Sequence, residues 1–170
     1  MNRQLPNVLS ALRVPLAVLF VLADGLWARL AIVAIAGLTD MFDGRIARTL
    51  GIASRTGEWL DPAADKTFMV VALVTLTIER DLPLWVLALL LLRDIGVLLG
   101  ALLLLTLGRV RTHVRARMTG KWVTWLQFIA IAVILMAPSL AVWIAAPVAL
   151  LGALALRDYA RALREPEPAG

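Results

Sequence analysis

The sequence contains no cysteine and only one histidine, His113. The absence of cysteine excludes disulfides, thiolate metal sites and cysteine nucleophiles from this chain. A single histidine, placed in a basic stretch, also excludes histidine metal clusters and Ser-His-Asp triads. Any catalytic chemistry must therefore use carboxylates, lysine, arginine, hydroxyl groups or bound metal ions.

Charged residues are also scarce, since they make up 17% of the chain whereas hydrophobic residues make up 61%. The mean hydropathy is +0.86, and a soluble domain is usually only about 45–50% apolar. So few charges cannot cover a globule of 170 residues, which favours an integral membrane protein over a soluble helical bundle. The formal net charge of +5 then indicates anionic lipid headgroups, and not nucleic acid, as the counter-charge.

Six apolar segments are separated by short polar connections. Their approximate ranges are 8–22, 27–39, 63–78, 82–107, 122–136 and 141–156. Because a spanning helix needs about 20 apolar residues, the sequence predicts an all-α integral membrane protein with six transmembrane helices. Residues 1–164 form a single membrane domain in this interpretation, and the polar, proline-containing tail 165–170 is expected to be disordered.

Basic residues are concentrated on one side of these six segments. With the N-terminus in the cytoplasm, most of the 17 Lys and Arg residues fall near the termini or in connections on the cytoplasmic side. The positive-inside rule therefore predicts that both termini face the cytoplasm. The expected location is a bacterial inner membrane, with a polar active-site cavity at the cytoplasmic face.

Four aspartates interrupt the apolar sequence between the second and third segments. Asp40 and Asp43 are spaced i, i+3, and Asp61 and Asp65 are spaced i, i+4, so each pair lies on one face of a helix. Four carboxylates gathered near a membrane repel one another unless some are protonated or cations lie among them. Hard divalent ions such as Mg²⁺ or Mn²⁺ prefer carboxylate oxygens, and two such ions suit phosphoryl displacement.

A structural alternative stays open, in which the aspartates form interfacial salt bridges with nearby basic residues. The candidates for such bridges are Arg45, Arg48, Arg55 and Lys66. The small residues around the acids favour a ligand site instead. Gly44 interrupts a helical pattern, where glycine costs roughly 1 kcal/mol relative to alanine but lets a ligand approach the backbone. Ala47 is also small, and Arg48 offers a planar guanidinium suited to a diphosphate.

Residues 40–65 read D-x-x-D-G-x-x-A-R, eight residues, then G-x-x-x-D-x-x-x-D. This pattern resembles the signature of the CDP-alcohol phosphotransferase family, also called CDP-alcohol phosphatidyltransferases, at every specified position. The resemblance extends over most of residues 5–135. It is most similar to the phosphatidylglycerophosphate synthase and CMP-forming cardiolipin synthase branches in the stretches LPNVLSALRVPLA, LDPAADK and GKWVTWLQ.

The resemblance implies a six-helix membrane protein, usually a homodimer, that transfers a phosphatidyl group from CDP-diacylglycerol to an alcohol and releases CMP. It also implies two divalent cations, Mg²⁺ or Mn²⁺, as cofactors. The residues that would bind these cations are Asp40, Asp43, Asp61 and Asp65. Asp65 would also act as the general base on the acceptor hydroxyl. The residues that would contact the cytidine diphosphate portion are Asp40, Asp43, Gly44, Ala47, Arg48 and Gly57.

Two anionic acceptors fit this branch: phosphatidylglycerol, which gives cardiolipin, and glycerol 3-phosphate, which gives phosphatidylglycerophosphate. The stretch LRDIGVL, with Arg93 before Asp94, is more similar to cardiolipin synthases, and we therefore expect phosphatidylglycerol. The basic residues expected to bind the acceptor are Arg13, Arg55, Arg111, Arg115, Arg117 and Lys121. For the four basic residues before the fifth segment, contact with the lipid surface is an equally good explanation.

The pair Arg93–Asp94 lies deep in an apolar segment and needs a reason. It is either a buried structural pair with partners on neighbouring helices, or it helps to orient the metal-binding aspartates. Two other classes of function agree less well with the sequence. A transporter would carry its acids near the membrane midplane on broken helices, often with repeat symmetry, and the sequence indicates neither feature. A non-catalytic membrane scaffold would not need every position of the signature.

Overall fold

The computed structural model describes residues 12–50, 57–106 and 118–164. Its helices, in chain order, are α2 (Arg13–Leu22), α3 (Leu26–Leu50), α4 (Gly57–Glu79), α5 (Leu84–Leu90), α6 (Leu92–Thr106), α7 (Met118–Met136), the short 3-10 helix η1 (Pro138–Leu140) and α8 (Ala141–Arg164). The described residues contain no strand, which confirms the predicted all-α class. The six apolar segments correspond in order to α2, α3, α4, α5 with α6, α7 and α8.

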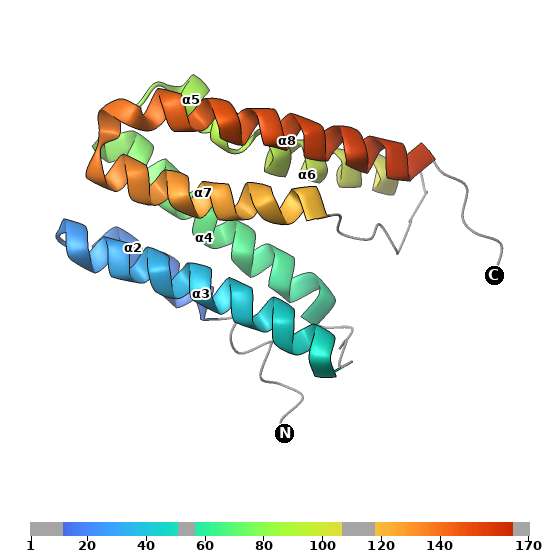
Figure 1. Cartoon of the computed structure of the whole chain (residues 1–170), viewed down its shortest axis with the longest axis horizontal. Helices are drawn as coiled ribbons and strands as arrows, with labels where there is room; N and C mark the ends of the chain where they lie inside the picture. The colour runs from blue at the N-terminus through green and yellow to red at the C-terminus, as the bar shows by residue number, and fades with distance from the viewer. Residues whose placement is uncertain (1–11, 51–56, 107–117, 165–170) are drawn as a thin grey trace.

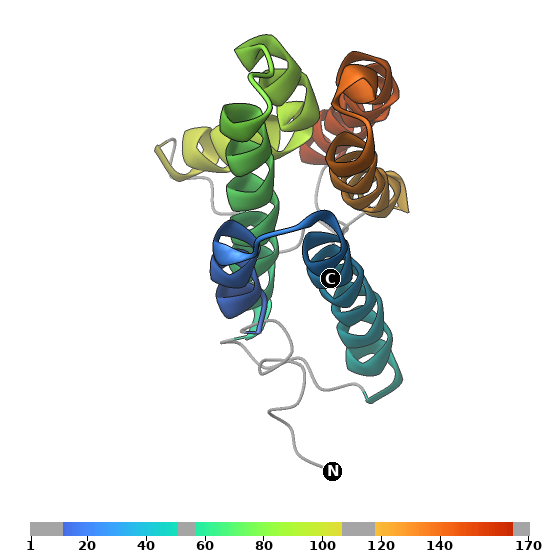
Figure 2. The same ribbon diagram turned by 90° about the vertical axis from the view of Figure 1, so that its left-hand side faces the viewer.

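Helices α2, α3, α4, α5 with α6, α7 and α8 run in alternating directions along the bundle (Figure 1). The C-terminal ends of α3, α6 and α8 and the N-terminal ends of α4 and α7 therefore lie at the same end of the molecule. Both α2 and α7 pack against α3 and α4, and Figure 2 shows α2 beside α4 and α3 beside α7. The helix ends that carry the aspartate stretch are thus held by two further helices.

Three phenylalanine rings join α2, α4 and α7 in the core. The rings of Phe20 and Phe68 meet edge to face with centroids 6.1 Å apart, and those of Phe68 and Phe128 stack at 6.0 Å. The helix α3 approaches the same cluster at Gly37, where a Cβ atom would lie 3.6 Å from the Phe128 ring. The first and second halves of the chain therefore share one apolar core.

The expected fourth segment, 82–107, is divided into two helices, α5 and α6, at Leu91. The backbone of Leu91 has φ −98° and ψ 4°, which lies outside the α-helical region. Beside the break, the Gln127 side-chain amide donates a 2.8 Å hydrogen bond to the Leu90 carbonyl. A side chain inserted at the backbone hydrogen-bond ladder is a recognised cause of a sharp helix bend. Helical bonding resumes where Ile95 N donates to Leu91 O at 2.9 Å.

By length and apolar composition, one helix among the described residues is suited to crossing a membrane, over Pro138–Arg161. Two other apolar helices, Arg13–Leu22 and Gly120–Met136, are shorter than that criterion. The division at Leu91 also leaves α5 and α6 as separate, shorter helices. The presence of six membrane spans therefore stays a prediction, as do the orientation of the termini and the polar cavity.

An ion pair ties α3 to α4 at the end of the bundle opposite to the aspartates. The Arg29 guanidinium bonds the Glu79 carboxylate through both terminal nitrogens, with Nη2 2.8 Å from Oε1. Its Nε donates to the Ala23 carbonyl at 3.0 Å, and its Cζ lies 5.3 Å from the centre of the Phe20 ring. Hydrogen bonding from Arg29 lowers the pKa of Glu79, which lies just beyond the third apolar segment.

The change Glu79→Gln should lower the stability of the protein by about 0.2–1 kcal/mol near neutral pH, because the pair is partly exposed to solvent. A carboxyl whose pKa is lowered in the folded state contributes stability above its unfolded pKa of about 4.3, and that contribution is lost as the pH falls through the folded value. Thermal unfolding of both proteins between about pH 7 and pH 3 measures this. A difference in stability between the two proteins that stays constant across this pH range would contradict the contribution of the Glu79 carboxylate.

Candidate functional site

The helices α3 and α4 carry all of the signature residues. These residues lie at the C-terminal end of α3 and the N-terminal end of α4, which are at the same end of the molecule (Figure 1). Asp40, Asp43, Gly44, Ala47 and Arg48 occupy the last three turns of α3, and Gly57, Asp61 and Asp65 occupy the first three turns of α4. Both aspartate pairs therefore lie in helices, as their spacing predicted. Of these side chains only that of Asp40 is described, so the convergence of the four carboxylates stays a prediction.

Asp40 forms an ion pair with Arg13, the first residue of α2. Arg13 Nη2 lies 3.2 Å from Asp40 Oδ1, and the Arg13 side chain is 2% exposed whereas that of Asp40 is 25% exposed. The pair links α2 to the acidic end of α3. Arg13 was expected to bind the acceptor. The structure places it against the first aspartate of the signature, and its role toward the acceptor stays a prediction.

This pair was not expected from the sequence, in which the basic residues nearest to the aspartates are Arg45, Arg48, Arg55 and Lys66. One signal was available. An arginine at the start of an apolar helix is costly to bury without an anion. The sequence contains only 12 acidic residues that could supply that anion. Only the packing of α2 against α3 identifies Asp40 as that anion.

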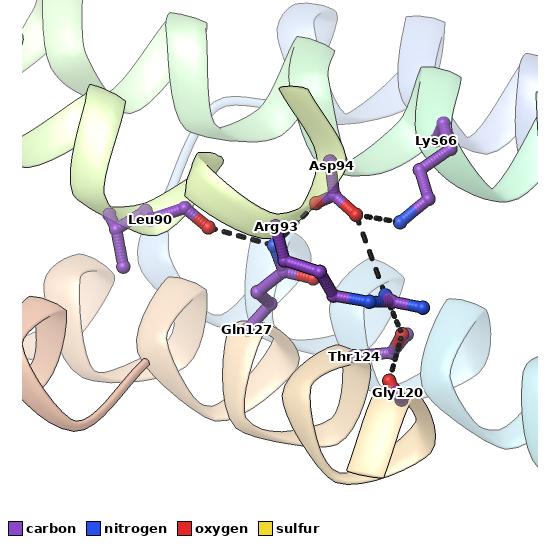
Figure 3. A network of polar contacts seen from close by, with 7 residues as sticks. All are labelled: Lys66, Leu90, Arg93, Asp94, Gly120, Thr124 and Gln127. Carbon is purple, nitrogen blue, oxygen red and sulfur yellow. Dashed lines mark hydrogen bonds and ion pairs between the residues drawn. The ribbon is translucent and has the colours of Figure 1, made fainter. Parts of the chain in front are cut away.

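Lys66, the residue after Asp65, pairs with Asp94 of α6 and not with a described aspartate of the signature (Figure 3). The Asp94 side chain is 7% exposed. Its Oδ1 also lies 3.5 Å from Arg93 Nη1, and its Oδ2 accepts a 2.6 Å hydrogen bond from Gln127 Nε2 of α7. The predicted buried pair therefore has its partners on the two neighbouring helices α4 and α7.

Arg93 is held in place by contacts on α7 and α8. Its Nη1 donates to Thr124 Oγ1 at 3.3 Å, and Thr124 donates in turn to the Gly120 carbonyl at 3.3 Å. A Cβ atom at Gly120 would lie 2.8 Å from Arg93 Nη2, and one at Gly152 would lie 3.4 Å from Arg93 Cβ. Two glycines thus provide the space that the arginine side chain occupies. We call Lys66, Arg93, Asp94, Thr124 and Gln127 the Asp94 network.

A broken helix beside an acid is typical of transporters. It was not expected in this chain. The break at Leu91 lies three residues before Asp94. Both carboxylate oxygens of Asp94 already accept hydrogen bonds from the protein. This arrangement is that of an interhelical anchor rather than of an ion pathway.

Of the other residues expected to bind the acceptor, Lys121 is described. It is half-buried in the first turn of α7 and follows Gly120, which faces Arg93. The rest lie outside the described residues, namely Arg55, Arg111, Arg115 and Arg117. Lys121 is therefore next in sequence to a glycine that borders the Asp94 network.

The donor set of the signature fits divalent cations of the hard type. All four expected ligands are carboxylates, and a chain without cysteine and with one histidine offers little to softer metals. Within residues 12–50, 57–106 and 118–164, no group of three or more acidic or histidine side chains is gathered. Three of the four expected ligand side chains are outside that description.

Comparisons with known proteins agree with the signature. A model of the CDP-alcohol phosphatidyltransferase family matches residues 3–154 of the chain. A protein of Mycobacterium tuberculosis named "Probable phosphatidylglycerophosphate synthase" is 37% identical over 95% of this chain and 82% of its own length. The CDP-diacylglycerol–glycerol-3-phosphate 3-phosphatidyltransferase of Bacillus subtilis is 33% identical over 78% of this chain and 76% of that protein. The CMP-forming cardiolipin synthase of Streptomyces coelicolor is 38% identical over 64% of this chain and 52% of that protein.

The pair Arg13–Asp40 should show energetic coupling. Arg13→Gln and Asp40→Asn should each lower stability, and the double variant should lose less than the sum of the two, with a coupling of about 0.5–3 kcal/mol. Unfolding of the four proteins measures this difference. Arg13→Gln combined with Glu79→Gln is the matched control, because Glu79 lies at the opposite end of the bundle and additive losses are expected there. Additivity for Arg13 and Asp40 as well would show that the pair does not form.

Proposed function

The chain belongs to the CDP-alcohol phosphatidyltransferase family, and we propose that it transfers a phosphatidyl group from CDP-diacylglycerol to an alcohol with release of CMP. The observation that carries this proposal is the complete signature over residues 40–65, inside a family match that covers residues 3–154. The helical placement of both aspartate pairs at one end of the bundle supports it.

The signature residues receive separate roles in this proposal. Two divalent cations, Mg²⁺ or Mn²⁺, would be held by Asp40, Asp43, Asp61 and Asp65. When bound, they would neutralise the diphosphate oxygens and the charge that develops on the leaving CMP. The small residues Gly44 and Ala47 leave room for the cytidine diphosphate, and the Arg48 guanidinium suits its phosphate oxygens. Gly57 begins α4 beneath this portion of the donor.

Asp65 is proposed to remove the proton from the acceptor hydroxyl. The acceptor oxygen then forms a bond to the phosphorus that carries the diacylglycerol, and the bond from that phosphorus to the oxygen of CMP breaks. The proton stays on the Asp65 carboxyl until it passes to water. A carboxylate suits this step if it lies within hydrogen-bond reach of the hydroxyl, and its place on α4 brings it one turn after Asp61.

An integral membrane location is part of the proposal, with six spans and both termini and the active site facing the cytoplasm of a bacterium. Large apolar side chains on the outside of the bundle support it, since Trp27 is 79% exposed and Trp143 is 76% exposed, and continuous exposed apolar surface is unusual in soluble monomers. The concentration of Lys and Arg on one side supports the orientation. A single membrane domain over residues 1–164 that forms a homodimer is likewise proposed by analogy with the family.

We favour glycerol 3-phosphate as the acceptor, since the relatives with that activity in their names align over more of both chains than the cardiolipin synthase does. Phosphatidylglycerol is the second candidate, and the Arg93–Asp94 sequence favours it. Both acceptors are anionic. The basic residues proposed to bind either of them are Arg13, Arg55, Arg111, Arg115, Arg117 and Lys121.

Purified protein in detergent with CDP-diacylglycerol and Mn²⁺ should release CMP once the correct acceptor is added. Glycerol 3-phosphate and phosphatidylglycerol, assayed side by side, identify that acceptor. Asp65→Asn should reduce turnover by about 10²–10⁴-fold, the usual contribution of a general base, while the protein stays folded. Glu79→Gln is the control and should turn over as the wild type does. Wild-type rates for Asp65→Asn would assign the base to another residue.

Lys121→Ala should raise the KM for the acceptor by about tenfold or more while the KM for CDP-diacylglycerol changes little. The expected size follows from the loss of a hydrogen bond to a charged group, which contributes about 1.5–3 kcal/mol. Steady-state kinetics with each substrate varied in turn measure the two constants. Equal changes in both would remove Lys121 from the acceptor site.

A further inference from the structure

We propose that Asp94 is a positioning residue for this reaction: by holding Lys66, it fixes the position and rotation of the first turns of α4, which carry the proposed metal ligands Asp61 and Asp65. The inference rests on the proposed function, because it concerns the helix that carries two of the proposed metal ligands. No catalytic contact with substrate is assigned to Asp94.

Asp94 receives donors from three helices. Lys66 Nζ comes from α4, Gln127 Nε2 comes from α7 at 2.6 Å, and Arg93 Nη1 belongs to α6 itself at 3.5 Å. Figure 3 shows these side chains gathered around the carboxylate at the start of α6. Since the Asp94 side chain is 7% exposed, little water competes for its oxygens. The contacts with Lys66 and Gln127 link α6 to α4 and α7, whereas Arg93 belongs to α6 itself.

The carboxylate is itself held in one orientation. Gln127 Nε2 bonds both Asp94 Oδ2 and the Leu90 carbonyl, so a single amide bridges the break between α5 and α6. Arg93 is bound to Thr124 and lies against Gly120 and Gly152. Movement of either neighbour of the carboxylate would therefore cost a further hydrogen bond. Asp94 is therefore a fixed point to which α4 is attached.

Lys66 is the position on α4 from which this attachment acts on the site. It follows Asp65 directly and lies five residues after Asp61. With 3.6 residues per turn, side chains of consecutive residues leave a helix about 100° apart. Holding Lys66 toward α6 therefore sets the rotation of the first turns of α4, and with it the direction in which Asp61 and Asp65 point. The same contact limits sliding of α4 along its axis.

Stability alone does not account for charged groups at this place. A buried ion pair is often no more stabilising than apolar residues of similar volume, because desolvation offsets the attraction. The apolar surroundings, with Leu90 and Leu91 both buried, would accept such residues. A charged contact with defined geometry is better explained by the need to hold α4 in one rotational position.

The test uses Mn²⁺ alone as the first probe, so that it does not depend on turnover. Free Mn²⁺ is measured by electron paramagnetic resonance during titration of the full-length protein in detergent. Asp94→Asn, which keeps the shape of the side chain but removes its charge, should weaken Mn²⁺ binding by about 10- to 100-fold, as is usual when a group that orients a metal ligand is changed. In the CMP-release assay its kcat should fall while the KM for CDP-diacylglycerol stays near the wild-type value.

Glu79→Gln is the matched control, because it removes the acid of the ion pair described at the opposite end of α4. It should leave Mn²⁺ binding and kcat unchanged. If Asp94→Asn does not fold, Lys66→Gln and Lys66→Arg carry the test. Lys66→Gln should weaken Mn²⁺ binding as Asp94→Asn does, and Lys66→Arg, which keeps the charge, should restore most of it.

The outcomes distinguish a failure of the proposed function from a failure of the positioning role of Asp94. A wild-type protein that binds no Mn²⁺ and releases no CMP with any acceptor overturns the proposed function itself. A wild-type protein that binds Mn²⁺, with Asp94→Asn and Lys66→Gln no different from Glu79→Gln, overturns only the positioning role. The positioning role would also be overturned if Lys66→Gln weakens Mn²⁺ binding and Lys66→Arg does not recover it. The positive charge at position 66 would then not be what supports Mn²⁺ binding.

Discussion

A carboxylate that leaves water for the interior of a helix bundle needs opposite charge and hydrogen-bond donors, since an unpaired buried charge is very costly. Asp94 meets this need with Lys66 from α4 and Gln127 from α7, and with Arg93 from its own helix. Each donor thereby becomes a constraint on the helix it comes from. The contact of Asp94 with Lys66 and Gln127 thus links α6 to α4 and α7 in addition to the apolar core.

Charged contacts between helices accompany the apolar core. The described ion pairs that join different helices are Arg13–Asp40, Arg29–Glu79 and Lys66–Asp94. The pair at Glu79 lies at the end away from the signature, whereas the other two lie beside residues proposed to bind metal. Between them the rings of Phe20, Phe68 and Phe128 connect α2, α4 and α7. A rigid centre with charged contacts at the proposed site suits chemistry that depends on fixed geometry.

Local irregularities make room for the Asp94 network. The break at Leu91 opens the Leu90 carbonyl to Gln127, and glycines at 120 and 152 leave space for Arg93. Glycine within a helix and a divided helix both cost stability. In this chain both costs occur around the same buried charges, which indicates that the bundle is built to keep those charges in place.

The helical class, the order of the helices and the family follow from the sequence, because hydrophobic patterning and signature spacing are local properties of the chain. The division of the fourth segment at Leu91 does not follow from such a pattern. The sequence also placed Asp40, Asp43, Asp61 and Asp65 in helices. Only the tertiary structure decided which partner each buried charge takes. Lys66 is adjacent to Asp65 in sequence, yet it pairs with Asp94, 28 residues away, because the fold brings the start of α6 within reach of the Lys66 side chain. Arg13 finds Asp40 for the same reason: contacts between helices depend on rotation and crossing, which no local pattern records.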